Sequence, residues 1–295
     1  MRVLLITNLA SGGAAKHDRD EIVGALEVLG DVVTVEPSSL ENFDREVQAA
    51  AVGRDLVVAA GGDGTFNCTI NALQRHLDDL RFALIPMGTG NDLARTLELG
   101  DDPVVVARGF AQGRERPLDV SVASGVGAER FFVNACMGGF PVQVNEALDE
   151  GEKEKLGAAA FIWGGVKALA DLERSTVRLN GESVPDCVAA GVGNGKTCGG
   201  GIAVWPDADP GDGRLEACAL GAEGPVALAK LAAKLKLGDH RELEGVVTDS
   251  GGKIRIDADP QIELNVDGEL IGLKTPATFE VVDKACLLVP GRPPS

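Results

Sequence analysis

The stretch DLVVAAGGDGTFN, residues 55–67, decides the fold of this chain. Its apolar run ends in a Gly-Gly pair, and the segment that follows places Phe66, Ile70 and Leu73 at helical spacing. An uninterrupted apolar run is typical of a strand that is buried on both faces of a parallel sheet. The stretch therefore predicts a strand, a tight glycine turn and a helix in direct succession.

The same succession repeats on both sides of this stretch. Apolar strands are predicted over 3–7, 32–36 and 81–88, and helices over 17–30, 43–51, 91–98 and 103–112. Such alternation is typical of a doubly wound α/β domain, which binds ligands at the carboxyl ends of its strands. We predict a domain of this kind over residues 1–117.

After Pro117 the pattern changes to shorter strands separated by Gly, Asp-Gly and Asn-Gly turns. Helical segments interrupt these strands near 142–172 and 224–237. We predict a second, mainly antiparallel β-sandwich domain over 118–275, and a last strand over 276–290 that could return to the first domain. Open strand edges in the second domain would also permit a homodimer.

Composition narrows the classes of function. The formal net charge is −17 and no run of Lys and Arg offsets it, so nucleic acid is excluded as a partner. The six cysteines and three histidines lack zinc-site spacing, which favours free thiols in a reducing compartment. No apolar run reaches the roughly 20 residues of a membrane span, and the N-terminal run is too short for a signal peptide. We expect a cytoplasmic protein, at most peripheral at the inner membrane face.

Three glycine-rich loops follow neighbouring strands of the first domain. Glycines at a strand-to-helix turn let backbone N–H groups approach a phosphate, and the helix N-terminus adds its positive end. Because these loops lie at one edge of the predicted sheet, we expect them to form a single nucleotide site. Its candidate residues are Asn8, Ser11, Gly12, Gly61, Gly62, Asp63, Gly64, Thr65, Asn67, Gly88, Thr89 and Asn91. Asp63 is open to two interpretations, a magnesium ligand or a helix cap.

A second glycine-rich stretch, GNGKT at 193–197, looks like a Walker loop but fails as one. The pattern G-x-x-x-x-G-K-[ST] requires a glycine at the place of Ala190 and a helix after Thr197. Three glycines and Pro206 follow instead, so no helix begins there. We interpret this stretch as a turn of the second domain, where Lys196 could still contact a phosphate or a headgroup.

Several motifs resemble the diacylglycerol kinase catalytic-domain family, in particular its soluble bacterial lipid kinases. The resemblance begins with NLASGG, GGDGTFN and GTGNDLAR, and continues through RPLDVSVA, FFVNACMGGF, the segment from GNGKT to DPGDGRLEA, and VDGEL. The first two motifs are shared with NAD kinases and phosphofructokinases. The later motifs point to the lipid-kinase branch, and together the motifs cover nearly the whole chain.

The resemblance implies transfer of the γ-phosphoryl group of ATP to the hydroxyl of a lipid such as diacylglycerol, with Mg²⁺. It implies a membrane-presented lipid substrate and a site between the two domains. The acidic residues that match positions organising magnesium are Asp63, Asp92 and Asp119. Glu269 matches the proposed general base, with Asp267 beside it. Within DPGDG the match is to a structural magnesium site, made by the Asp212 side chain and by carbonyls near Asp209 and Arg214.

Other interpretations remain open from the residues alone. Without the resemblance, DGE and DPGDG are ordinary polar turns, and the apolar stretch 158–170 is as well explained by a core helix as by an acyl-chain pocket. An NAD kinase-like or other small-molecule kinase is the nearest alternative function. A nucleotide-binding regulator without catalysis is a more distant one. No residue separates diacylglycerol from other lipid alcohols as the acceptor.

Overall fold

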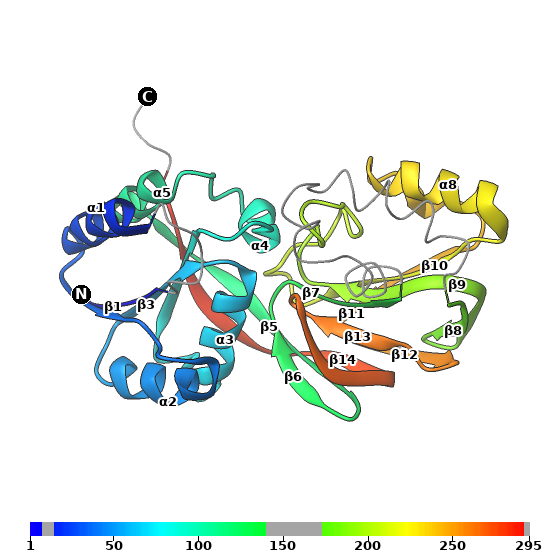
Figure 1. Cartoon of the computed structure of the whole chain (residues 1–295), viewed down its shortest axis with the longest axis horizontal. Coiled ribbons are helices and arrows are strands. Elements are labelled where there is room, and N and C mark those ends of the chain that lie inside the picture. The colour runs from blue at the N-terminus through cyan, green and yellow to red at the C-terminus, as the bar shows by residue number, and fades with distance from the viewer. Residues whose placement is uncertain (8–14, 140–172, 292–295) are drawn as a thin grey trace. The chain divides into compact units, whose positions relative to one another are not determined.

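The computed structural model describes residues 1–7, 15–139 and 173–291 and divides the chain into two units. Unit 1 comprises residues 1–120 and 282–295, and unit 2 comprises residues 121–281. The chain passes between them twice, in β5 (Arg114–Val126) and in β14 (Glu269–Val289) (Figure 1). Unit 1 is therefore discontinuous in sequence.

Unit 1 is built on a parallel sheet. Its strands are β1 (Arg2–Thr7), β2 (Asp31–Val35), β3 (Leu56–Gly61), β4 (Arg81–Pro86) and the end of β14. They lie in the order β2-β1-β3-β4-β14, with every one of these pairs parallel. All residues of β3 are buried, as its apolar run predicts. The doubly wound α/β fold is thus confirmed.

Helices cover both faces of this sheet. Figure 1 shows α1 (Ala15–Glu27) with α5 (Pro103–Gly109) on one face, and α2 (Leu40–Ala51) with α3 (Asp63–Ala72) on the other. Short 3₁₀ turns follow α3 and α5, at Gln74–His76 and Phe110–Gln112. The helix expected over 91–98 is only α4 (Asp92–Thr96), because Glu98 adopts a left-handed backbone with φ of 56°.

Unit 2 is an antiparallel assembly whose strand pairing closes on itself. The closed path runs β9-β7-β13-β14-β12-β8-β9, and β10, β11, β5 and β6 extend it. The bounds are β6 (Glu129–Phe132), β7 (Ala135–Gly139), β8 (Ser175–Leu179), β9 (Glu182–Gly193), β10 (Leu215–Gly221), β11 (Val246–Gly251), β12 (Lys253–Asp259) and β13 (Glu263–Val266). One core lies between these strands, where Phe132 and Phe279 meet edge to face with ring centroids 6.4 Å apart.

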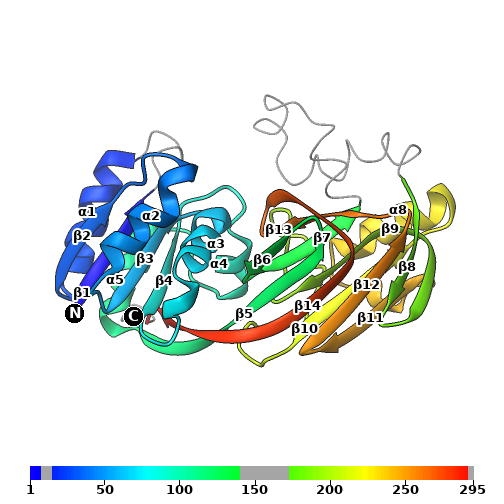
Figure 2. The same cartoon turned by 90° about the horizontal axis from the view of Figure 1, so that it is seen from below.

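Two helical elements of unit 2 are described, α8 (Gly224–Leu235) and a 3₁₀ turn at His240–Glu242 (Figure 2). The helix expected near 142–172 and the apolar stretch 158–170 lie outside the described residues. No helix among the described residues is long and apolar enough to cross a membrane.

The structure differs most from the sequence prediction in β14. The segments QIELNVDGEL, ATFEVV and CLLVP suggest separate strands, but Glu269–Val289 is one strand of 21 residues. Its polar residues do not mark turns, because exposed and buried positions alternate from Gly272 to Ala277. The strand β11 was not predicted, because as an edge strand paired only with β10 it has no fully buried residue and little apolar pattern.

Candidate functional site

The glycine-rich loops after β3 and β4 touch through their backbones. A Cβ on Gly88 would lie 2.5 Å from Cα of Gly62, closer than real atoms approach. The Asn91 side chain closes the second loop, since its Oδ1 accepts from N–H of Gly88 at 3.0 Å and its Nδ2 donates to the Gly88 carbonyl at 2.7 Å. Glycine is required at this contact because no side chain fits between the loops.

Asp63 links the two loops by capping a helix that is not its own. Its Oδ2 accepts from N–H of Asp92 at 2.9 Å, and its Oδ1 accepts from N–H of Leu93 at 3.2 Å, at the start of α4. Asp63 therefore caps α4 and not the helix of its own turn, which differs from the local cap that the sequence suggests. The carboxylates of Asp63 and Asp92 both face Gly90, since their Oδ2 atoms lie 3.6 and 3.8 Å from a Cβ built on that residue.

Arg95 holds this acidic pair in place. Its Nη1 donates to Oδ1 of Asp92 at 2.9 Å, and its Nη2 donates to the carbonyl of Gly90 at 3.0 Å. Asp92 is only 5% exposed, so the arginine offsets a carboxylate that would otherwise be costly to bury. A pocket of about 330 Å³ opens against this loop, lined by Thr89, Asn91 and Arg95 among others.

The N-terminus of α3 has no side-chain cap. Its N-cap residue is Gly62, which has no side chain. Among the described residues, no side chain caps the N–H groups of the first turn. Backbone N–H groups at an uncapped helix N-terminus are a ready site for a phosphate. Gly62 and Gly64 lie at this helix start, as the nucleotide hypothesis expects.

The remaining predicted nucleotide residues differ in their surroundings. Gly61 packs against Thr65, since a Cβ on it would lie 2.4 Å from the Thr65 hydroxyl oxygen. Asn67 is 1% exposed and its Oδ1 accepts from Nδ2 of Asn71 at 3.0 Å, so it supports α3 from within. Asn8, Ser11 and Gly12 lie outside the described residues.

Asp119 is buried in β5, at the end of unit 1. Its side chain has no exposed surface and lies 3.3 Å from Nζ of Lys284 on β14. A buried carboxylate needs such a partner, because desolvation alone would disfavour its charge. The local sequence does not indicate that Lys284 pairs with Asp119, because β14 approaches β5 only in the folded chain.

In unit 2 the DGE motif forms the turn between β13 and β14. Asp267 and Gly268 have φ of 46° and 97°, as the two central residues of a tight hairpin turn require. The Asp267 carboxylate is 6% exposed and accepts three backbone N–H groups, from Val133 at 2.9 Å, Asn134 at 3.0 Å and Ala135 at 2.7 Å.

The turn gives the two acids of DGE different surroundings. Asp267 is directed into backbone N–H groups, whereas Glu269 lies 3.2 Å from Nη2 of Arg130 and keeps 37% of its side chain exposed. These contacts fit Asp267 for holding backbone, and its expected place among the catalytic groups stays a prediction. Arg130 was not anticipated from sequence. Its only local signal is a basic residue directly before the apolar FFV of the resemblance motif.

Two buried asparagines join the GNGKT loop to the segment that Asp267 holds. N–H of Asn194 and N–H of Gly195 both donate to the Asn134 carbonyl at 2.8 Å, and Nδ2 of Asn194 donates to the Val133 carbonyl at 2.7 Å. Nδ2 of Asn134 donates to the Thr197 carbonyl at 3.1 Å. The GNGKT loop and the DGE turn are therefore braced as one assembly, at the end of which Lys196 is exposed.

The DPGDG turn is closed by its own hydrogen bonds. Oδ1 of Asp209 accepts from N–H of Gly211 at 3.2 Å, and Oδ1 of Asp212 accepts from N–H of Arg214 at 2.9 Å. The Arg214 side chain donates to the carbonyl of Ser250 at 2.9 Å. Across the described part of the chain, no three His, Cys, Asp or Glu side chains gather closely enough to hold a metal. A cation at this turn would need backbone carbonyls as ligands.

Comparisons with known proteins cover both units. The model of the diacylglycerol kinase catalytic domain matches residues 2–123, and that of the YegS C-terminal NAD kinase beta sandwich-like domain matches 134–289. A "Probable lipid kinase YegS-like" of Stenotrophomonas maltophilia is 34% identical over 247 residues, 80% of this chain and 79% of that protein. One of Xanthomonas oryzae pv. oryzae is 34% identical over 265 residues, 85% of each chain. A solved diacylglycerol kinase structure from Bacillus anthracis has a TM-score of 0.77 at 25% identity, covering 98% of this chain and 96% of that one.

The contact between the glycine loops predicts a localised effect of added side chains. Gly88→Ala forces a methyl group against Gly62 and should lower the free energy of unfolding by about 1–3 kcal/mol, the usual cost of overpacking. Gly90→Ala is the matched control, because its Cβ would meet only ordinary contacts at 3.6 Å. Urea unfolding of both variants measures the difference. Equal stability of the two would contradict a tight loop contact.

The role of Asp267 predicts sensitivity to loss of its charge. Asp267→Asn keeps the shape of the side chain but turns an NH₂ group toward backbone N–H donors, which should cost about 1–3 kcal/mol of stability. The exposed Asp78 has no recorded contact among the described residues, so Asp78→Asn should change stability by less than about 0.5 kcal/mol. Thermal unfolding by circular dichroism tests this, and an unchanged midpoint for Asp267→Asn would exclude the positioning role.

Proposed function

Because the chain belongs to the diacylglycerol kinase catalytic-domain family and carries the YegS-type C-terminal domain, we propose that it is an ATP-dependent lipid kinase. It would transfer the γ-phosphoryl group of ATP to the hydroxyl of a lipid alcohol, with diacylglycerol as the first candidate. The observation that carries this proposal is the acidic pair Asp63 and Asp92, held beside an uncapped helix N-terminus and a pocket.

The nucleotide phosphates would bind at the glycine loops of unit 1. Backbone N–H groups at the start of α3 supply donors without side-chain competition, and the small loop residues allow close approach. Arg95 would hold the second loop in the same conformation when phosphate binds, because it donates to Asp92 and to the Gly90 carbonyl. Phosphoryl transfer depends mainly on such positioning and on neutralising charge.

Mg²⁺ fits the donors of unit 1. Asp63 and Asp92 place two carboxylates beside Gly90, and carboxylate oxygens with water are the ligands that Mg²⁺ prefers. Bound there, the ion would neutralise charge on the phosphates. We also propose Asp119 as a charge near the phosphates, and the DPGDG turn as a structural site made by Asp212 and by carbonyls near Asp209 and Arg214.

Glu269 is the proposed general base. As the lipid hydroxyl oxygen bonds to the γ-phosphorus, the bond from that phosphorus to the bridging oxygen of ADP breaks and the hydroxyl proton moves to the Glu269 carboxylate. Arg130 at 3.2 Å orients this carboxylate, and Asp267 fixes the turn from which it projects. Asp267 and Glu269 thus have separate tasks, one holding backbone and one accepting a proton.

A substitution of Glu269 separates this function from its alternatives. Glu269→Gln should lower lipid-dependent kcat by about 10²–10⁴-fold, the usual contribution of a general base. ATP consumption is measured with diacylglycerol micelles, with NAD and without an acceptor, each with Mg²⁺ and with EDTA. Glu182→Gln, an exposed position on β9 without a recorded contact among the described residues, is the control and should retain activity.

The outcomes of this assay are distinct. Turnover with NAD but not with lipid would replace the proposal by an NAD kinase. ATP binding without turnover on any acceptor would favour a regulator. Full activity of Glu269→Gln would remove the assigned base. Mass spectrometry of a lipid extract incubated with the enzyme and ATP identifies which lipid alcohol gains a phosphate.

We propose that α8 contacts the membrane that presents the lipid. Val226 and Leu237 are 82% and 70% exposed on and just after this helix, and Lys230 and Lys236 are exposed beside them. No acidic residue occurs between residues 224 and 238, although the chain is strongly acidic. Exposed apolar and basic side chains on one helix suit the headgroup region of an anionic bilayer.

This membrane contact predicts charge-dependent vesicle binding. The double variant Lys230→Gln/Lys236→Gln should bind phosphatidylglycerol vesicles at least about tenfold more weakly, since each lysine near such a surface contributes about 1 kcal/mol. Lys274→Gln, an exposed lysine of β14, is the matched control. Sedimentation with vesicles measures binding, and an unchanged affinity of the double variant would exclude α8 as the contact.

A further inference from the structure

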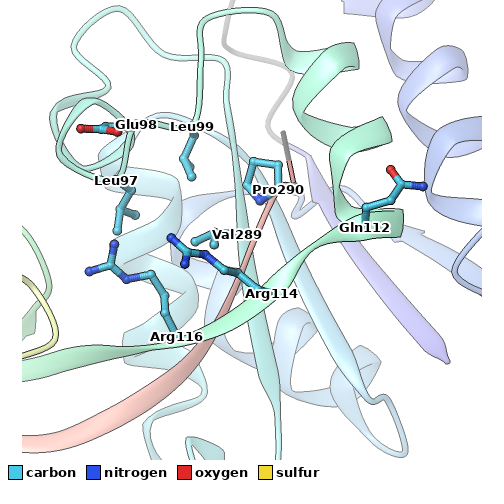
Figure 3. A pocket seen from close by; sticks show the side chains of 9 residues that line it. Leu97, Glu98, Leu99, Gln112, Arg114, Arg116, Val289 and Pro290 are labelled. Atoms are coloured by element: carbon cyan, nitrogen blue, oxygen red, sulfur yellow. The ribbon is translucent and has the colours of Figure 1, made fainter. Parts of the chain in front are cut away.

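A second pocket of unit 1 has a lining unlike that of the nucleotide loops. Its volume is about 430 Å³, and it lies between the end of α4, the start of β5 and the end of β14 (Figure 3). Leu97, Leu99, Val289 and Pro290 give it apolar walls, and Arg114 and Arg116 enter it from β5. This volume falls within the range of small-molecule sites.

The strand geometry of β5 explains why two arginines enter one pocket. Successive side chains of a strand point to opposite faces, so Arg114 and Arg116 share a face and Glu115 takes the other. Glu115 forms an ion pair with Arg81, away from the pocket lining. The sequence Arg-Glu-Arg thus directs its two cations into the pocket and its acid out of it, as Figure 3 shows for the arginines.

Arg114 brings a positive charge into the pocket. Arg114 has no ion-pair partner in the described part of the chain. Glu98 is the only acid among the lining residues, and Figure 3 places its carboxylate apart from both guanidinium groups, beyond Leu97.

We propose that this pocket is a second anion site, which binds a phosphate monoester carried on an apolar group. A guanidinium fork matches the oxygens of a phosphate, and two forks on one strand can share one phosphate group. The leucine, valine and proline walls would cover the apolar part of the ligand. The site is distinct from the acidic pair of the glycine loops, and its existence does not depend on the proposed kinase activity.

Calorimetric titration tests the site directly. The full chain is first saturated with Mg²⁺ and a non-hydrolysable ATP analogue, so that phosphate cannot report on the glycine loops. The probes are inorganic phosphate, glycerol 3-phosphate, dihexanoyl phosphatidic acid below its micellar concentration, and uncharged dihexanoylglycerol. The phosphate-bearing lipid should bind and the uncharged lipid should not.

Variants then identify the residues. Arg114→Gln and Arg116→Gln should each weaken binding of the phosphate-bearing lipid by about tenfold or more, the effect of losing a charge-assisted hydrogen bond. Glu98→Gln should strengthen it several-fold by removing the one negative charge of the lining. Arg75→Gln is the matched control, because Arg75 is an exposed arginine of unit 1 outside the pocket. Thermal unfolding should match the parent chain in all four variants, and affinity for the ATP analogue should match it in the three arginine variants.

The results separate the sources of the phosphate. Much tighter binding of dihexanoyl phosphatidic acid than of glycerol 3-phosphate assigns a lipid ligand, whereas similar affinities assign a soluble phosphate ester. Absence of binding by every phosphate-bearing probe would overturn the proposal. So would equal affinity in the parent chain and in both arginine variants. Failure of the kinase assay would leave these titrations unaffected.

Discussion

The approach of Gly62 to Gly88 is the constraint on which the unit 1 site depends. Two backbones this close exclude a side chain at Gly88, and the loops must then be held in register by other groups. Asp63 does this by accepting N–H groups from the start of α4, and Asn91 closes the second loop on itself. The acidic pair beside the pocket exists because this contact fixes both loops.

Unit 2 uses the same physical device with different residues. Asp267, like Asp63, is an acid at a turn whose carboxylate accepts backbone N–H groups of another segment. In both cases the negative charge is satisfied by peptide dipoles, which orders a neighbouring loop without adding a side-chain partner. The buried asparagines Asn134 and Asn194 extend that order to GNGKT. Order of this kind suits groups that must be positioned before a substrate arrives.

The sequence was informative where patterns are local. Apolar runs and glycine turns predict the strands and helices of unit 1, because each element carries its own period. The roles of Asp267 and Lys284 could not be predicted, since Asp267 binds N–H groups more than 130 positions earlier and Lys284 meets Asp119 only after folding. The paired direction of Arg114 and Arg116 was in principle readable from strand alternation, but the pocket they enter is formed by three separate segments.

The strand β14 determines when the sheet of unit 1 can be completed during translation of the chain. Its last residues pair with β4, so the sheet of unit 1 gains that edge strand only after all of unit 2 has left the ribosome. Until then β4 exposes unpaired N–H and C=O groups, the usual template for association between nascent chains. Residues 1–120 thus leave the ribosome first, but their sheet receives its last strand only at the end of translation. That edge of β4 therefore lacks this partner strand for as long as unit 2 takes to be translated.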